Sequence, residues 1–287
     1  MDLNNAVLTE SWATVLKNKQ IKMLKMFIGV CNVLDLKYYV LGGTALGTIR
    51  HNGFIPWDDD IDIGMPREDY EIFLTEGQPL FSENYFLQSI FSDPNYPHSF
   101  AKIRDSATTF IEQNVKHIHM NHGVYIDIFP LDGVAKTRFK RVYFDLLNKA
   151  YSVKINTILD YSMSNKKSSL KGKVFKTLAL FFMKHLTVKE VLILRDKLYK
   201  KYRLNSSEMI ANYCGAWGKR EIVSKSTFGN GLIKQFEKLN VIVPENFDAY
   251  LTSLYDNYME LPPLDKRKPR HYCSVIDLEN SYIHYIK

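Results

Sequence analysis

Acidic residues are crowded into one short stretch, PWDDDIDIGMP at residues 56–66, of a chain whose net charge is +7. Asp60 and Asp62 alternate there with Ile61 and Ile63, which is the two-residue period of a β-strand. Two carboxylates on one strand face, roughly 6.5–7 Å apart, repel one another unless a cation lies between them. Their oxygens suit Mg²⁺ or Mn²⁺, so we predict that both aspartates bind such an ion.

A solvated acidic turn before an edge strand would have a similar sequence. The run Asp58–Asp60 alone would favour such a turn. The alternation that continues to Ile63 weighs against it, because a buried strand carries two aspartates on one face only if something pairs them.

A third acid, Asp127, lies within Tyr-Ile-Asp-Ile-Phe, a second apolar stretch in residues 123–134. Neighbouring strands lie about 4.8 Å apart, so Asp127 could join Asp60 and Asp62 at one site. Three carboxylates from two strands are the arrangement of metal-dependent phosphoryl transfer.

A glycine turn precedes the acids. Gly42, Gly43 and Thr44 stand between a predicted strand at 38–43 and a predicted helix at 44–51. Backbone amides at a helix start, together with a threonine hydroxyl, can bind phosphate. The glycine spacing does not fit a dinucleotide-binding fingerprint, and no Walker lysine follows. The turn therefore indicates a phosphate site only in combination with the acids after it.

The elements that must position these residues follow from the periodicity of the chain. An order of strand, helix, strand, helix, several strands and then a Lys-rich helical stretch predicts an α+β fold, with an α/β core followed by a helical subdomain. Besides those above, we predict helices at 8–35, from Pro66 onward, through much of 138–203 and near 248–259, and strands at 60–64, 85–91, 99–104, 108–113 and 123–129.

The bulk composition narrows the function classes. With 287 residues, 46% of them hydrophobic, the chain can bury a substantial core. Three widely separated cysteines, no secretory signal and no long apolar run favour the cytosol. The positive charge suggests an anionic partner, but no nucleic-acid-binding module is recognisable, so we expect no nucleic acid.

The block GGTALGTIRHNGFIPWDDDIDIGMPREDY, residues 42–70, resembles the signature of the LicD family of bacterial phosphocholine transferases, which is related to the fukutin-type transferases. Residues 100–112 and 122–134 extend the resemblance. It implies a nucleotidyltransferase-like mixed β-sheet with flanking helices. We expect a single transferase unit, 1–287, made of a catalytic core 1–135, a helical subdomain 136–205 and a C-terminal α/β segment 206–287 that completes the site.

The resemblance also implies an activity. Such enzymes transfer a phospho-alcohol, usually phosphocholine, from a CDP-alcohol to a hydroxyl of a glycan or lipid-linked glycan, such as a lipopolysaccharide, teichoic-acid or capsule precursor, and release CMP. Carried onto this chain, Asp60, Asp62 and Asp127 would hold the metal, and Asp58 is the first acid of the family block. Gly42, Gly43 and Thr44 would contact the phosphates.

Other roles are nominated from the residues themselves. Arg50, Lys102 and Arg104 are the cations nearest the motifs, so we expect them to bind phosphate, with a surface salt bridge an equal alternative for Arg50 and Lys102. Asp127 is the first candidate for the base that deprotonates the acceptor hydroxyl, and His122 is the second. Trp57 would stack on a base or on choline, or would belong to the core.

Two features of the sequence allow more than one interpretation. In LYDNYM, Asp256 and Asn257 stand where the family more often has Gly-Asp, which leaves the substrate in doubt. Residues 166–185 alternate lysines with apolar side chains, so this helix either contacts the inner face of the membrane or packs on the core.

Other functions compete with this one. A nucleotidyltransferase would move the nucleotide itself onto a sugar or small-molecule hydroxyl. A basic nucleic-acid-binding protein and a degenerate, glycan-binding transferase are disfavoured by the intact acidic set.

Overall fold

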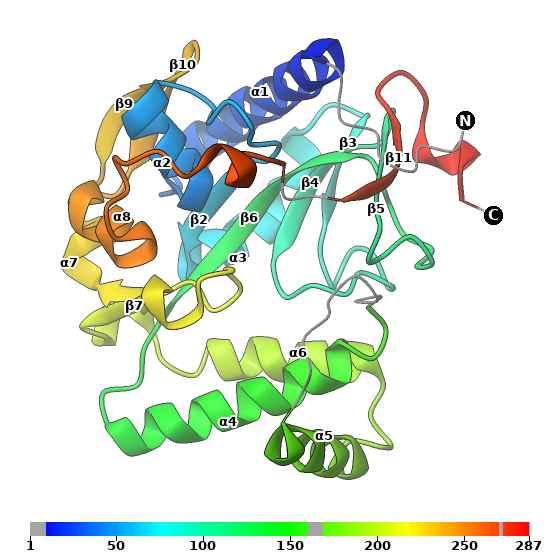
Figure 1. The fold of residues 1–287 in the computed structure, drawn as a ribbon, viewed down its shortest axis with the longest axis vertical. Helices are drawn as coiled ribbons and strands as arrows, with labels where there is room; N and C mark the ends of the chain where they lie inside the picture. The colour runs from blue at the N-terminus through cyan, green and yellow to red at the C-terminus, as the bar shows by residue number, and fades with distance from the viewer. Residues whose placement is uncertain (1–9, 160–168, 270–271, 287) are drawn as a thin grey trace.

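A mixed seven-stranded sheet forms the centre of the molecule, for which a computed structural model describes residues 10–159, 169–269 and 272–286. Five strands follow the order β1-β2-β6-β4-β3, and β7 and β8 continue from the end of β6 (Figure 1). The strands are β1 Tyr39–Val40, β2 Asp62–Pro66, β3 Tyr85–Gln88, β4 Ala101–Asp105, β6 Val124–Gly133, β7 Met209–Ala211 and β8 Ile222–Ser224. Two further antiparallel pairs are β5 Thr109–Glu112 with β11 Cys273–Asp277, and β9 Leu232–Phe236 with β10 Leu239–Val243.

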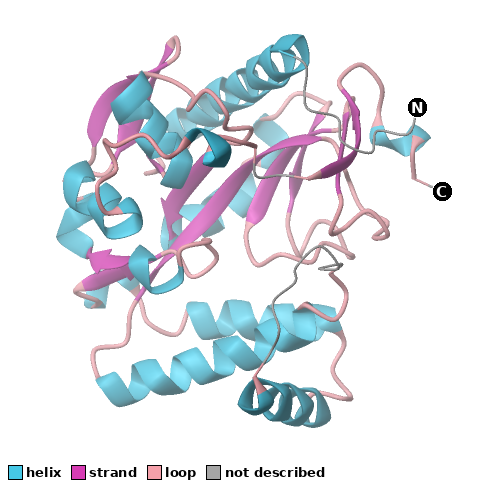
Figure 2. Cartoon of the chain, in the orientation of Figure 1, coloured by secondary structure: helices cyan, strands magenta, loops and turns pink. Residues whose placement is uncertain are grey.

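Helices cover the sheet and also form a layer of their own. In Figure 2, α4, α5 and α6 lie together below the sheet, separate from the helices around it. The helices are α1 Glu10–Val33, α2 Gly42–His51, α3 Arg67–Glu76, α4 Arg138–Ile155, α5 Leu170–Phe182, α6 Val188–Tyr199, α7 Lys225–Phe228 and α8 Phe247–Tyr255. Short 3₁₀ turns occur at Gln78–Leu80, Leu204–Ser206, Gly218–Glu221, Leu264–Lys266 and Tyr282–His284. The predicted α+β class is confirmed, whereas the three-part division of the chain stays a prediction.

β6 is the strand around which the sheet is built. All ten of its residues are buried, and it pairs with β2 in parallel and with β4 antiparallel. Ile126 and Ile128 face a large core, while Asp127 between them faces the opposite side of the sheet.

The elements around the acidic stretch differ from the prediction at their ends. The expected strand at 38–43 is short, because helix α2 already begins at Gly42, where φ is +48°. Likewise β2 begins only at Asp62, so Asp60 lies in the turn before the strand. A positive φ at Gly42 allows the chain to pass directly from β1 into α2.

A buried ion-pair network attaches the helical layer to the sheet. Arg67, at the start of α3, donates to both carboxylate oxygens of Asp132 on β6, at 2.7 and 2.6 Å. Its third contact is Asp196 on α6, at 3.0 Å. Burial lowers the pKa of Arg67, but the two carboxylates outweigh it and raise that pKa overall. Arg67 therefore ties α3, β6 and α6 together.

Candidate active site

A cavity of about 890 Å³ opens where α2, β2, β6 and the segment after α8 meet. Four of the predicted aspartates line it: Asp58, Asp60, Asp62 and Asp127. Asp62 and Asp127 are direct partners on the parallel strands β2 and β6, and the Asp127 amide donates to the Ile61 carbonyl at 2.9 Å. Partners on adjacent strands project to the same face. The structure therefore brings the two acidic motifs together at one site.

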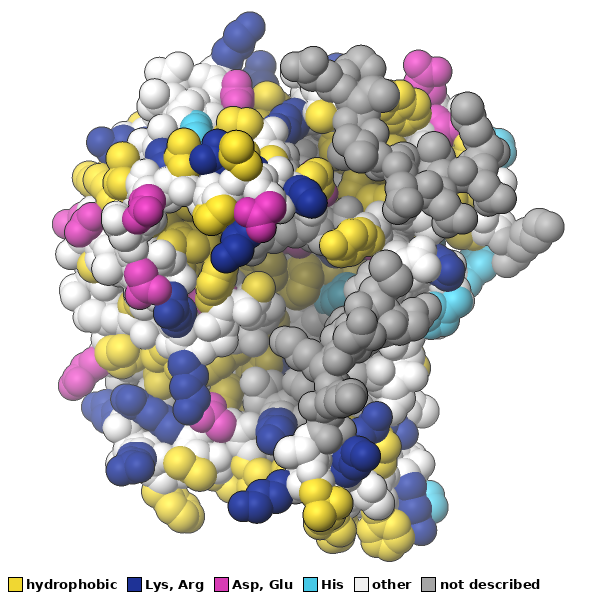
Figure 3. Space-filling view, viewed as in Figure 1, with side chains coloured by type: hydrophobic (Ala, Val, Ile, Leu, Met, Phe, Trp, Pro, Cys, Tyr) yellow, Lys and Arg dark blue, Asp and Glu magenta, His cyan; other side chains and the backbone are white. Residues whose placement is uncertain are grey.

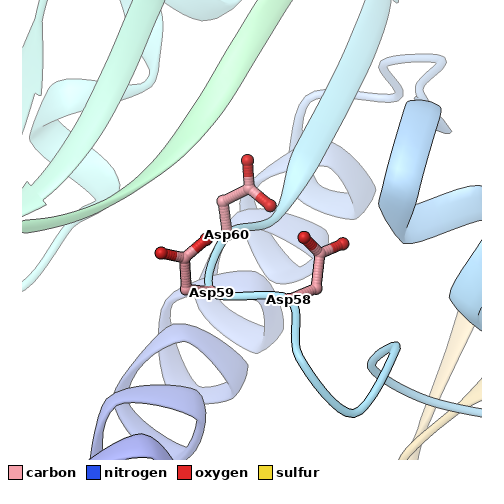
Figure 4. Close-up of side chains that lie close together, drawn as sticks. All are labelled: Asp58, Asp59 and Asp60. Carbon is pink, nitrogen blue, oxygen red and sulfur yellow. The ribbon is translucent and has the colours of Figure 1, made fainter. Parts of the chain in front are cut away.

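The turn before β2 adds the remaining acids. One carboxylate oxygen from each of Asp58, Asp59 and Asp60 lies within 4.8 Å of the other two, and Figure 4 shows the three side chains on this turn. Asp59 is buried and does not line the cavity, and its carbonyl accepts from the Gln20 side chain at 2.8 Å. Asp58 and Asp60 are thus the members of this run that belong to the site.

The glycine turn makes room for these acids. A Cβ atom on Gly43 would collide with Asp58 Oδ2, and one on Gly42 would lie 3.1 Å from Asp62 Oδ2. Both carboxylates therefore lie against the first turn of α2, whose positive dipole end stabilises negative charge. The Thr44 hydroxyl does not line the cavity, and instead accepts from the Asp62 amide at 2.9 Å.

Comparison with known proteins identifies this arrangement. Residues 35–163 match the family model described as "LicD/FKTN/FKRP, nucleotidyltransferase domain". This range contains the glycine turn and all four cavity aspartates named so far. Residues 35–163 are a LicD-family domain.

Individual relatives agree with the family model. The chain is 28% identical over 266 residues to the lipopolysaccharide cholinephosphotransferase LicD of Haemophilus influenzae, a match that covers 88% of this chain and 92% of that protein. The human ribitol 5-phosphate transferase FKRP is 43% identical over 42 residues, which are 15% of this chain and 8% of FKRP. An uncharacterised protein of Rickettsia prowazekii is 49% identical over 49 residues, 17% of this chain and 18% of its own.

Besides Thr44, two more predicted phosphate ligands of this LicD domain do not line the cavity. Lys102 is only 2% exposed, and its Nζ lies 2.9 Å from Asp127 Oδ1 and 3.3 Å from the centre of the Tyr125 ring. Arg104 is fully buried, where it donates to Gln88 at 2.7 Å and to the Gly123 carbonyl at 2.9 Å. Neither side chain lines the cavity. Lys102 reaches Asp127 on β6, and Arg104 reaches Gln88 on β3 and the residue before β6. The ion pair of Lys102 is buried, whereas the alternative reading placed it on the surface.

Of the other predicted residues, Arg50 and Trp57 line the cavity and His122 does not. Arg50 lines the cavity and donates to the Tyr258 carbonyl at 2.6 Å, and burial lowers its pKa. Trp57 also lines it, half-buried, with the Arg267 guanidinium 5.5 Å from its ring centre. His122 is fully buried away from the cavity and contacts the Ile118 carbonyl at 2.8 Å, and burial lowers its pKa.

One wall of the cavity contains residues that no sequence motif predicts. Trp217 packs edge-on against Tyr255 at 4.9 Å between ring centres, and Glu221 lies beside them, nearly fully buried. Burial raises the pKa of Glu221 to about 7, although its carboxylate accepts the Trp217 amide at 2.8 Å. No predicted motif includes Trp217 or Glu221, because their positions follow only from the pairing of β7 with β6 and of β8 with β7.

The electrostatics of the cavity wall suit a bound cation. Its described residues include seven acidic side chains but two basic ones, Arg50 and Lys266. A diphosphate would be repelled by this wall unless metal ions neutralised it. The donors are all carboxylates, which are the ligands of Mg²⁺ and Mn²⁺. The residues present therefore fit a divalent metal, with Asp60, Asp62 and Asp127 as candidate ligands.

Proposed function

We propose that this protein transfers phosphocholine from CDP-choline to a hydroxyl of a cell-surface glycan or lipid-linked glycan precursor, and that Mg²⁺ or Mn²⁺ bound by Asp60, Asp62 and Asp127 assists the transfer. The observation that carries the proposal is the register of β2 and β6, which makes Asp62 and Asp127 direct partners on one wall of the cavity.

The general class of reaction follows from the relatives of the chain. The protein is a phosphotransferase for substituted phosphate groups, since the LicD-family domain is shared with a named cholinephosphotransferase and a named ribitol 5-phosphate transferase. These names support a phospho-alcohol as the transferred group and a glycan as the kind of acceptor, and leave the alcohol to be argued from the site.

The cavity wall favours a cationic alcohol. Trp57, Trp217, Tyr255 and Tyr258 supply aromatic side chains, and Asp256 adds a carboxylate. Faces of aromatic rings attract quaternary ammonium groups, whereas a neutral polyol such as ribitol needs hydrogen-bonding partners instead. Choline is therefore our first choice. Asp256, where the chain departs from the family's Gly-Asp pattern, lines the cavity, but its carboxylate is ion-paired with Arg220 at 2.8 Å.

The residues of this chain have separable tasks in the transfer. A divalent metal would neutralise the charge of the migrating phosphoryl group. Asp127 would accept the proton of the acceptor hydroxyl, because it lines the cavity and a carboxylate at this position can act as a base. Lys102 holds Asp127 Oδ1 and so orients the carboxylate. Arg50 fixes the segment after α8 against the cavity through the Tyr258 carbonyl.

Incubation with a panel of CDP-alcohols tests the proposal. We expect CMP to be released fastest from CDP-choline, compared with CDP-ribitol and CDP-glycerol, in the presence of Mg²⁺. Release from CDP-ribitol alone would refute the choice of alcohol. A nucleotidylated acceptor formed with release of pyrophosphate from a nucleoside triphosphate would instead support the alternative, a nucleotidyltransferase.

A further inference from the structure

Two exposed apolar stripes run along the helices that lie farthest below the sheet. On α4 the stripe consists of Phe139, Val142, Tyr143 and Leu146, which recur at intervals of three and four residues. These side chains are exposed, and Phe139 is 82% exposed. Residues at this spacing share one face of a helix, and such a face is normally buried.

The stripe on α5 has the same character. Leu170, Val174, Leu178, Phe181 and Phe182 are all exposed, with Phe182 at 79%. The opposite side of α5 packs against the small core of the helical layer through Ala179 and buried Met183, which follows the helix. The predicted membrane helix at 166–185 is therefore packed on one side and open on the other, although residues 166–168 lie outside the described residues.

The same two helices carry much of the positive charge of the chain. They contain eight lysine and arginine residues and a single acid, Asp145. Lys149 on α4 lies 4.7 Å from the ring centre of Phe175 on α5, so the helices pack as one unit. Dark blue and yellow side chains alternate along the lower edge of the molecule in Figure 3, where α4 and α5 lie in Figure 1.

We propose that the exposed faces of α4 and α5, here called the basic apolar surface, bind an anionic lipid membrane by shallow insertion of their aromatic and aliphatic side chains. Lysines beside exposed apolar residues are the composition of interfacial helices, in which ammonium groups contact lipid phosphates. Among the described residues, no helix combines the length and apolarity needed to cross a bilayer. A second copy of the chain fits this surface poorly, because its lysines would face lysines of the same charge.

The basic apolar surface is connected to the cavity through β6. β6, which carries Asp127, ends at Gly133, and α4 begins at Arg138. Arg67 joins Asp132 on β6 to Asp196 on α6. The helical layer is thus fixed to the strand that carries a candidate catalytic acid, so lipid binding would hold the cavity in a set orientation to the membrane.

Vesicle co-sedimentation of the full chain, without substrate, tests the proposal. We expect binding to vesicles that contain phosphatidylglycerol and little binding to phosphatidylcholine alone. The double variant Lys171→Gln/Lys173→Gln should bind about 25-fold more weakly, at roughly fivefold for each lysine near an anionic surface. The matched control is Lys22→Gln/Lys25→Gln, two exposed lysines on α1.

The apolar contribution is tested separately. Phe181→Ser/Phe182→Ser should lower binding at least about tenfold, because two exposed aromatic rings lose their contact with lipid. Ile233→Ser, which removes a 72% exposed side chain on β9, should bind as the wild type does. Wild-type affinity in both lysine and phenylalanine variants would overturn the proposal. So would a dimer that Phe181→Ser/Phe182→Ser dissociates in a chain that binds no vesicles. Neither result would bear on the transfer reaction, which is assayed with soluble donor.

Discussion

Lys102 Nζ lies 2.9 Å from Asp127 Oδ1, and the two residues are direct partners on the antiparallel strands β4 and β6. The lysine is buried behind the cavity and does not line it. Its contact with the site is therefore the ion pair with Asp127.

Replacement of this lysine distinguishes positioning from direct phosphate binding. Lys102→Gln should lower kcat while the KM for the donor changes little, because the side chain does not reach the cavity. Loss of one partner of a buried pair should also lower the free energy of unfolding by about 3–5 kcal/mol. Lys19→Gln, which removes a more exposed lysine 3.5 Å from Asp105, is the control and should cost less than about 1 kcal/mol. A large rise in KM at unchanged kcat would contradict the positioning role.

Asp62 is positioned by strand pairing, since it lies on β2 directly opposite Asp127 on β6. Asp62→Asn should reduce turnover by about two orders of magnitude or more, because it removes a charge from the proposed metal site. The circular dichroism spectrum and melting temperature should stay close to those of the wild type. Asp35→Asn is the control, since Asp35 is exposed in a left-handed conformation, φ +53°, that asparagine tolerates. Near-normal turnover of Asp62→Asn would remove Asp62 from the site.

Metal dependence is a separate expectation from the same acids. Treatment with EDTA should abolish release of CMP, and added Mg²⁺ or Mn²⁺ should restore it, because the acidic wall repels a diphosphate without a cation. Isothermal titration with Mn²⁺ gives an independent readout, and Asp62→Asn should weaken the binding it detects. Full activity in metal-free buffer would contradict the proposed mechanism.

The first turn of α2 offers a steric test. Gly43→Ala should lower activity, because the new methyl group would displace the Asp58 carboxylate from its place over the helix. Gly29→Ala on α1 is the matched control, since no atom lies within 4 Å of the added carbon. That control should keep full activity and gain about 0.5–1 kcal/mol in the free energy of unfolding. Equal activity of the two variants would show that the Asp58 position is unimportant.

Glu221 predicts a dependence of stability on pH. Burial raises its pKa from 4.5 to about 7 in the folded chain. Between these values the unfolded chain releases a proton that the folded chain keeps, so stability is lost as pH rises through this window. The loss should amount to roughly 3 kcal/mol. In denaturant unfolding as a function of pH, Glu221→Gln should have a flatter profile, whereas the exposed control Glu83→Gln should keep the wild-type slope. An unchanged slope in Glu221→Gln would refute this assignment.

Much of the site follows from local sequence. The alternation around Asp62 and Asp127 predicts two strands with acids on one face, and it does so because side chains of a strand alternate with a fixed period. The structure confirms the α+β class and places both acids at one cavity. The sequence predicts a glycine turn at Gly42 and Gly43, and the structure places both at the start of α2. Their close approach to Asp62 and Asp58 depends on tertiary packing.

Only the tertiary structure decided which neighbours these residues have. Lys102 and Arg104 lie close to the motifs in sequence, yet neither lines the cavity, because Lys102 forms a buried ion pair with Asp127 and Arg104 donates to Gln88 and to the Gly123 carbonyl. Glu221 is distant in sequence and reaches the cavity through the pairing of β7 and β8. Periodicity fixes the face of the strand on which a side chain lies, because that face depends only on the backbone dihedrals of adjacent residues. The partner across the sheet depends on how distant strands pair, and no local pattern contains that information.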